Sequence, residues 1–154
     1  MREITVSRDL AAPRAAVWGV LADFPNIADW NGGVKKSFAT SEATEGVGAT
    51  RHCDLAPLGG LEETIKEWEP EERLVVSIDS AAKLPIKSGL ATFTLDESDA
   101  ATSARVEYSY ETRFGPVGAA LGPLLDKQLS KGFSGFLDDL ETAANARAPE
   151  GDAG

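Results

Sequence analysis

The longest hydrophobic pattern in the chain runs from residue 117 to residue 146. Apolar side chains recur there at steps of three and four residues, which is the spacing of one face of an α-helix. The apolar residues are Leu121, Leu125, Leu129, Phe133, Phe136, Leu137 and Leu140, and the opposite face carries Asp126, Lys127, Lys131, Asp138, Asp139 and Glu141. The pattern predicts one long amphipathic helix.

Shorter stretches of alternating apolar and polar residues precede this helix, which is the pattern of half-buried β-strands. Turn residues separate them. Two short helices interrupt the series: one follows Pro13 and ends near Asp23, and the other runs from Pro25 to Trp30. The predicted strands cover residues 3–9, 34–40, 49–55, 61–68, 73–79, 88–95 and 103–114.

This order of elements predicts an α+β protein in which a curved, seven-stranded antiparallel sheet wraps around the C-terminal helix, with two short helices after the first strand. Such a pairing tends to leave a cavity between sheet and helix, and we expect the functional site there. Residues 1–146 are predicted to form one domain, and the small, polar residues 147–154 to form a disordered tail.

The order and spacing of several short motifs resemble the START-like superfamily, also called SRPBCC, whose helix-grip fold is shared by pollen-allergen-like proteins, plant hormone receptors and polyketide cyclases. The resemblance covers most of residues 4–140. Its motifs are Ala12-Pro13 with Val17-Trp18, Leu21 to Phe24, Trp30, Gly46 to Arg51, Gly59-Gly60, Glu63 to Ile65, and Glu69-Pro70 with Arg73-Leu74. The resemblance implies the fold but no single reaction, because this fold carries transport proteins, receptors and enzymes.

Composition narrows the range of partners. The 154 residues include 15 basic and 25 acidic ones, for a formal charge of −10, which disfavours binding to nucleic acid. The single cysteine, Cys53, fits a reducing compartment. Neither a signal peptide nor a membrane span is apparent. We therefore expect a cytoplasmic protein, as a monomer or weak dimer.

Arg51 and Glu63 are the most informative polar residues. If residues 57–60 close a hairpin between two strands, Arg51 and Glu63 lie side by side or diagonally on one face. Leu55 and Ile65 mark that face as the inner one. The pair could orient a ligand, or Glu63 could act as a catalytic base with Arg51 and Tyr108 stabilising an enolate oxygen. It could also be an ion pair that only closes the wall.

Other residues on the predicted inner faces are candidates for ligand contact. Tyr108 and Tyr110 offer hydroxyl groups, and Trp30 lies near one mouth of the cavity, although residues in such positions more often serve packing. The full set of predicted ligand-binding residues is Trp30, Arg51, Cys53, Glu63, Ile65, Val76, Ile78, Ala91, Phe93, Tyr108, Tyr110, Leu129, Phe133 and Phe136.

Several chemistries find no support in the sequence. The only histidine, His52, alternates outward and has no second histidine with which to share a metal ion. Cys53 has no histidine on its face to activate it, and no glycine-rich loop precedes a helix to bind phosphate. We therefore predict neither a metal nor a cofactor.

Two further features have open interpretations. Trp68 has the opposite parity from Glu63 and Ile65, so it is predicted on the outer surface unless a bulge shifts the register. Gly132 and Gly135 each weaken the long helix, either to leave room for a ligand or a bend, or to allow close packing on the sheet.

Three functions follow from the sequence and the resemblance. The first is binding of a hydrophobic small molecule such as a lipid, polyketide or isoprenoid in the cavity. The second is a polyketide cyclase or dehydrase acting on a ligand held there. The third is an interaction protein that acts through its surface. The resemblance also places loops 56–60 and 81–87 where hormone receptors have gating loops, although the receptors' gate and latch sequences are missing here.

Overall fold

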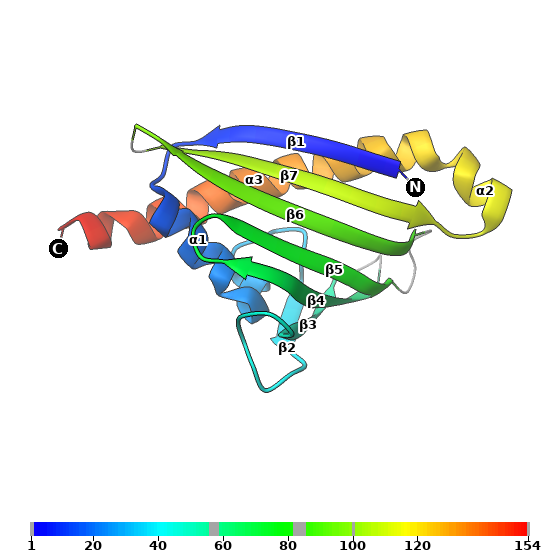
Figure 1. Ribbon diagram of the computed structural model, residues 1–154, viewed down its shortest axis with the longest axis horizontal. Helices are drawn as coiled ribbons and strands as arrows, with labels where there is room; N and C mark the ends of the chain where they lie inside the picture. Colours follow the sequence, from blue (N-terminus) through cyan, green and yellow to red (C-terminus); the bar gives the residue numbers. More distant parts are fainter. Residues whose placement is uncertain (1, 56–58, 82–85, 100, 154) are drawn as a thin grey trace.

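The seven predicted strands form one antiparallel sheet in the order β1-β7-β6-β5-β4-β3-β2 (Figure 1). The computed structural model describes residues 2–55, 59–81, 86–99 and 101–153. Strands β2 to β7 form a meander, and β1 closes the sheet beside β7. The strands are β1 (Arg2–Leu10), β2 (Lys36–Ala39), β3 (Thr50–Asp54), β4 (Gly60–Glu69), β5 (Arg73–Ala81), β6 (Ile86–Ser98) and β7 (Ala101–Thr112).

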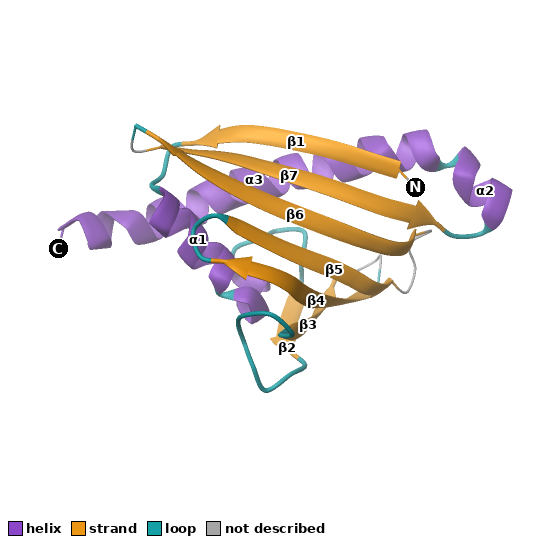
Figure 2. Ribbon diagram, viewed as in Figure 1, coloured by secondary structure: helices purple, strands orange, loops and turns teal. Residues whose placement is uncertain are grey.

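The helices lie on one face of this sheet (Figure 2). They are α1 (Arg14–Ala22), the 3₁₀ helix η1 (Phe24–Asp29), α2 (Gly115–Ala120) and α3 (Gly122–Ala153). Among the described residues, none of the helices is both long and apolar enough to cross a bilayer. The architecture is the predicted helix-grip arrangement of a seven-stranded sheet and a long C-terminal helix.

The single long helix predicted from residue 117 is divided at Leu121 into α2 and α3. Gly118 explains how closely α2 packs, because a Cβ atom at this position would lie 1.7 Å from the carbonyl oxygen of Arg113. At the other end, α3 extends beyond Arg147 to Ala153. The mobility of residues 147–154 in solution stays a prediction.

Acidic side chains of α3 attach the helix to β1. Arg2 Nη2 donates to Asp126 Oδ2 at 2.6 Å, and Arg8 forms an ion pair with Asp138. The backbone N–H of Ala11 donates to Glu141 Oε2 at 2.6 Å. The two ion pairs are six residues apart on β1 and twelve residues apart on α3, and each separation spans about 20 Å. Because the two spans match, the ion pairs hold α3 parallel to β1.

Trp68 lies on the inner side of the sheet, so the prediction that it covers the outer surface was wrong. The pairing of β4 with β5 shifts register between Ile65 and Glu67, and this irregularity reverses the parity of the residues that follow. Trp68 packs edge-to-face on Trp18 of α1 with ring centroids 5.0 Å apart. The end of β4 therefore contributes to the core beneath α1.

Gly132 and Gly135 are exposed, and an added Cβ at either would meet no atom within 4 Å. Close packing against the sheet is therefore not the reason for these glycines. The residues of α3 that pack most closely on the core lie in its C-terminal half: Phe136, Leu137, Leu140 and Ala144.

We expect Gly135→Ala to raise the free energy of unfolding by about 0.5–1 kcal/mol, because alanine lowers the entropy of the unfolded chain without a clash. Urea denaturation measures this difference. Gly118→Ala is the matched control and should destabilise the protein, since its methyl group would collide with the Arg113 carbonyl. A loss of stability in Gly135→Ala would contradict the packing described here.

The stability contribution of Asp126 should depend on pH. Hydrogen bonds from Arg2 and then Tyr110 lower the pKa of the Asp126 carboxyl. A lowered folded-state pKa gives stability that is complete above the unfolded-state value, about 3.9, and is lost as the pH falls through the folded-state value.

The difference in unfolding free energy between the natural protein and Asp126→Asn should therefore be constant near neutral pH and shrink below about pH 4. Urea unfolding at a series of pH values tests this. Asp96→Asn, at an exposed position of β6, should show no such trend. A difference that persists unchanged into strong acid would show that the charge of Asp126 does not matter.

Candidate functional site

Arg51 and Glu63 face each other across strands β3 and β4, as predicted. The alternation of buried and half-buried residues along β3 places Arg51 and Cys53 on the inner face. Arg51 is 7% exposed and Glu63 is 8% exposed. Arg51 Nε donates to Glu63 Oε1 at 2.9 Å, so the two charges form a buried ion pair.

The guanidinium group of Arg51 also contacts η1. Its Nη1 donates to the backbone carbonyl oxygen of Phe24 at 2.8 Å. The guanidinium carbon lies 3.8 Å from the centroid of the Phe24 ring, which is a cation–π contact. Arg51 therefore joins the sheet to the short helix that follows α1. No sequence pattern indicated that Phe24 would be its partner in that helix.

Cys53 completes one side of this cluster. Its Sγ lies 3.4 Å from Glu63 Oε1 as a weak donor. Burial, opposed by Arg51, raises the pKa of the Cys53 thiol to about 12. The thiol is therefore protonated at neutral pH, which agrees with a small buried side chain rather than a thiolate nucleophile.

Tyr108 on β7 has a buried hydroxyl group with no hydrogen-bond partner among the described residues. Gly89 on β6 leaves room for it, since a Cβ at Gly89 would lie 2.2 Å from Tyr108 Oη. Burial raises the pKa of Tyr108, and the Glu63 carboxylate raises it further. The hydroxyl therefore stays protonated and can donate a hydrogen bond.

Tyr110 faces inward as predicted but has a different function. Its hydroxyl donates to Asp126 Oδ1 at 2.6 Å, and burial followed by this hydrogen bond raises its pKa to about 12. The rings of Tyr108 and Tyr110 stack with centroids 5.6 Å apart. Tyr110 therefore secures α3, whereas the neighbouring tyrosine keeps its hydroxyl unpaired.

Aromatic residues of α3 cover this part of the sheet. The ring of Phe133 lies 5.3 Å from that of Tyr108. Phe136 lies 5.3 Å from Phe93 of β6 and 5.1 Å from Trp30. Leu129 and Phe133 are only half-buried, although they pack against the core.

The interior is nearly filled at the α1 end. Side chains of α1, η1, β3, β5, β6 and α3, among them Phe24, Trp30, Arg51 and Phe136, enclose about 10 Å³. That is roughly the room one water molecule needs. The prediction of a spacious cavity beside Trp30 is thus not met, because Phe136 and Phe93 occupy the space. The indole Nε1 of Trp30 is buried there without a partner.

The other predicted lining residues also lie on the inner side. Ile65, Val76 and Ala91 are buried, and Ile78 is half-buried. Their contact with a ligand stays a prediction. Of the two loops compared with gating loops, residues 56–58 and 82–85 lie outside the described part of the chain.

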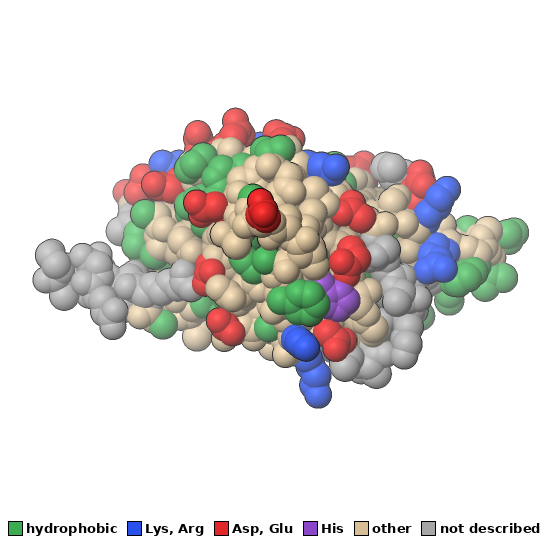
Figure 3. Space-filling view, turned by 90° about the horizontal axis from the view of Figure 1, so that it is seen from below, with side chains coloured by type: hydrophobic (Ala, Val, Ile, Leu, Met, Phe, Trp, Pro, Cys, Tyr) green, Lys and Arg blue, Asp and Glu red, His purple; other side chains and the backbone are tan. Residues whose placement is uncertain are grey.

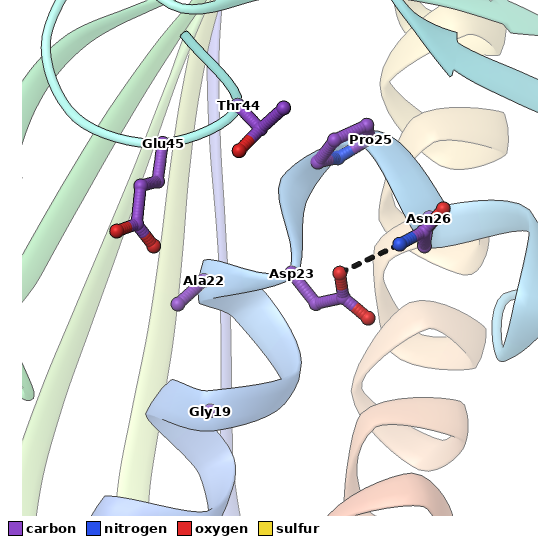
Figure 4. Close-up of a pocket in the computed structure, with 7 residues that line it drawn as sticks. All are labelled: Gly19, Ala22, Asp23, Pro25, Asn26, Thr44 and Glu45. Atoms are coloured by element: carbon purple, nitrogen blue, oxygen red, sulfur yellow. Dashed lines mark hydrogen bonds between the residues drawn. The ribbon is translucent and has the colours of Figure 1, made fainter.

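A second hollow, of about 360 Å³, lies at the surface between the end of α1, η1 and the loop that precedes β3 (Figure 4). Small residues such as Gly19 and Ala22 form part of its wall. Asp23 Oδ1 accepts a hydrogen bond from Asn26 Nδ2 at 2.8 Å. The hollow is larger than the interior space. None of the buried, unpaired polar atoms found in the described part of the chain lies in its wall, so the inner face remains the candidate site.

Comparison with solved structures supports the fold. A protein from Thermus thermophilus superposes with a TM-score of 0.78 at 18% identity, covering 94% of this chain and 98% of the other. The Zhui aromatase/cyclase from a Streptomyces species gives a TM-score of 0.78 at 17% identity, with 95% and 94% covered. A START superfamily protein from Mycobacterium smegmatis gives 0.77 at 13% identity, with 94% and 97% covered.

No curated protein matches the sequence of this chain. A family model does, however, and it matches residues 1–145, which is nearly the whole length. Together with the seven-stranded sheet and its long C-terminal helix, this match shows that the chain belongs to the family of polyketide cyclases/dehydrases and lipid transport proteins.

Proposed function

We propose that this protein binds an apolar small molecule carrying an oxygen function, between the inner face of the sheet and the middle of α3. The unpartnered, buried hydroxyl of Tyr108 is the observation that carries the proposal. An unsatisfied buried hydroxyl costs about 1–3 kcal/mol, which a ligand oxygen at hydrogen-bonding distance would offset.

Glu63 provides a second polar contact on the same wall. Its Oε1 is engaged by Arg51 and Cys53, and Oε2 accepts no hydrogen bond from the described residues. A ligand hydroxyl could therefore donate to Oε2, directly or through water. The surrounding wall is apolar, which is the usual composition of a small-molecule site with a few orienting polar groups.

Ligand entry requires aromatic side chains to move. Phe133 covers Tyr108, and Phe136 fills the space beside Trp30. Phe133 is itself half-buried, as are Leu129 one turn before it and Leu125 two turns before it. We infer that the ligand takes the place of these side chains against the sheet.

The family supports this class of ligand, since it comprises polyketide cyclases/dehydrases and lipid transport proteins. Lipids, polyketides and isoprenoid-like molecules all combine an apolar body with few oxygen atoms. We place their binding in the cytoplasm, in keeping with a single cysteine that is buried and protonated.

Catalysis of a cyclisation or dehydration is the second candidate. The grouping of Arg51, Glu63 and Tyr108 on one wall favours it, because a carboxylate and two donors could act on a bound polyketide. Binding is ranked first because Arg51 is already held by both Glu63 and Phe24, which leaves the guanidinium group little freedom to stabilise a developing charge.

Tyr108→Phe separates binding from stability. Naphthol and naphthalene are suitable probes, since they share an apolar body and differ by one hydroxyl. We expect the natural protein to prefer naphthol, and Tyr108→Phe to lose about tenfold in naphthol affinity while naphthalene affinity is unchanged. Fluorescence titration measures both constants.

Tyr110→Phe is the matched control for this experiment. It loses the hydrogen bond to Asp126 and should lower the melting temperature without changing the preference for naphthol. Tyr108→Phe should be at least as stable as the natural protein, because it removes an unpaired polar group. Equal naphthol affinity in the natural protein and Tyr108→Phe would refute the assigned hydrogen bond.

Glu63→Gln should lower the free energy of unfolding by about 3 kcal/mol, because it leaves the buried guanidinium of Arg51 without a counter-charge. Urea denaturation measures the loss. Glu62→Gln, on the exposed side of β4, should change stability by less than about 1 kcal/mol. If Glu63→Gln is stable but abolishes turnover of a test polyketide, catalysis rather than binding alone is the better account of the site.

A further inference from the structure

Four large apolar side chains are exposed at one end of the molecule, in the segment from the end of β7 to the first turn of α3. They are Phe114, Val117, Leu121 and Leu124, and they are between 37% and 65% exposed. We call this surface the tip. Figure 3 shows hydrophobic side chains gathered at the end of the molecule formed by α2, with Lys and Arg side chains near them.

The tip is the outer side of a helical segment whose inner side is already packed. Gly118 lies against the end of β7 and Gly122 against Arg2. Leu121 accepts the helical hydrogen bond of Leu125 across the junction between α2 and α3, so the segment is nearly continuous. The segment is apolar on both its inner and its outer side, and only the inner side packs against the rest of the protein, so the outer side has no apolar partner.

Basic residues continue the tip along α3. Lys127 and Lys131 follow Leu124 at steps of three and four residues, on the same side of the helix, and both are exposed. Between residues 112 and 137 the sequence holds three basic residues and one acidic residue, in a chain whose net charge is −10. The one acid, Asp126, is paired with Arg2, so the exposed Lys127 and Lys131 give this side of α3 a positive charge.

The backbone at Phe114 points to a use for its exposed ring. Phe114 has φ of 68°, in the left-handed region that bulky side chains rarely adopt, and the guanidinium of Arg113 lies 5.0 Å from its ring centroid. Glycine would fit this turn without strain. Backbone strain of this kind lowers stability, and such strain is found most often at functional sites.

We propose that the tip docks on an anionic lipid surface, with its apolar side chains inserted at the headgroup boundary and Arg113, Lys127 and Lys131 near the lipid phosphates. A projecting apolar end with a cationic border fits a fluid bilayer, whereas a rigid protein partner would need a matching groove. The tip lies outside the proposed ligand site, so its test does not depend on any ligand.

The experiment is co-sedimentation of the intact protein with two kinds of vesicle: pure phosphatidylcholine, and phosphatidylcholine with about one third phosphatidylglycerol. We expect binding to the anionic vesicles and about tenfold weaker binding to the neutral ones. High salt should weaken the anionic binding, because it screens the basic residues.

A matched pair of variants tests the apolar part. Val117 is 65% exposed at the tip, and Val47 is 68% exposed in the loop before β3. Val117→Asp should weaken binding to anionic vesicles about tenfold or more, whereas Val47→Asp should leave it unchanged. An equal effect of both substitutions would mean that net charge alone decides binding, and would overturn the proposal.

Phe114→Gly keeps the test independent of folding. This substitution relieves the left-handed backbone, so the melting temperature should stay the same or rise, while vesicle binding falls. If the natural protein binds neither vesicle, the proposal is wrong. It is also wrong if Val117→Asp abolishes a dimer seen by light scattering while vesicle binding persists, because the tip would then be the contact between two copies of the chain.

Discussion

The buried guanidinium of Arg51 links the two layers of this molecule. A charge that is removed from water must be paired and hydrogen-bonded, or the fold loses several kcal/mol. Arg51 meets this requirement with a carboxylate from the neighbouring strand, Glu63, and with the carbonyl and ring of Phe24 from η1. Because these partners come from separate parts of the chain, the ion pair fixes η1 against the sheet and places a carboxylate in the inner wall. The polar character of the wall thus has a structural origin. Tyr108, on β7, adds an unpaired hydroxyl to the same face of the sheet, with β5 and β6 between it and Glu63.

The sequence predicted the helices, the strands and the residues on the inner face of the sheet more closely than it predicted the size of the interior cavity. Strict alternation in β3 and the short turn to β4 were enough to place Arg51 opposite Glu63. Trp68 was misplaced because a register shift in β4 depends on pairing with β5, which no local pattern reveals. Likewise, the two inward tyrosines look alike in the sequence. Only the position of α3 gives Tyr110 a partner in Asp126 and leaves Tyr108 without one, and that position depends on ion pairs between residues more than 120 positions apart.

The two halves of α3 differ in how they are held. The C-terminal half buries Phe136, Leu137 and Leu140 against the core, where α1 also packs. The N-terminal half has half-buried Leu125 and Leu129 on its inner side and exposed Leu124 on its outer side. Its polar contacts with the sheet are the hydrogen bonds and ion pair of Asp126 with Arg2 and Tyr110, and a hydrogen bond from the Tyr110 hydroxyl to the Gly122 carbonyl oxygen. Segments with few buried apolar contacts open at low free energy, so this half of the helix is the one that can move.

This division connects the two proposals. The tip and the cover over Tyr108 belong to one helical segment, so a lipid surface that binds Val117 and Leu121 acts on the same element that closes the ligand site. Insertion of the tip into a bilayer would favour the position of this segment that exposes more apolar surface to the lipid. In that position Leu125 and Leu129 would no longer pack on the sheet. The same movement opens the path to the unpaired hydroxyl of Tyr108. Binding to the bilayer and opening of the interior would then be linked in free energy, so that an apolar ligand is exchanged at the membrane and held closed in water.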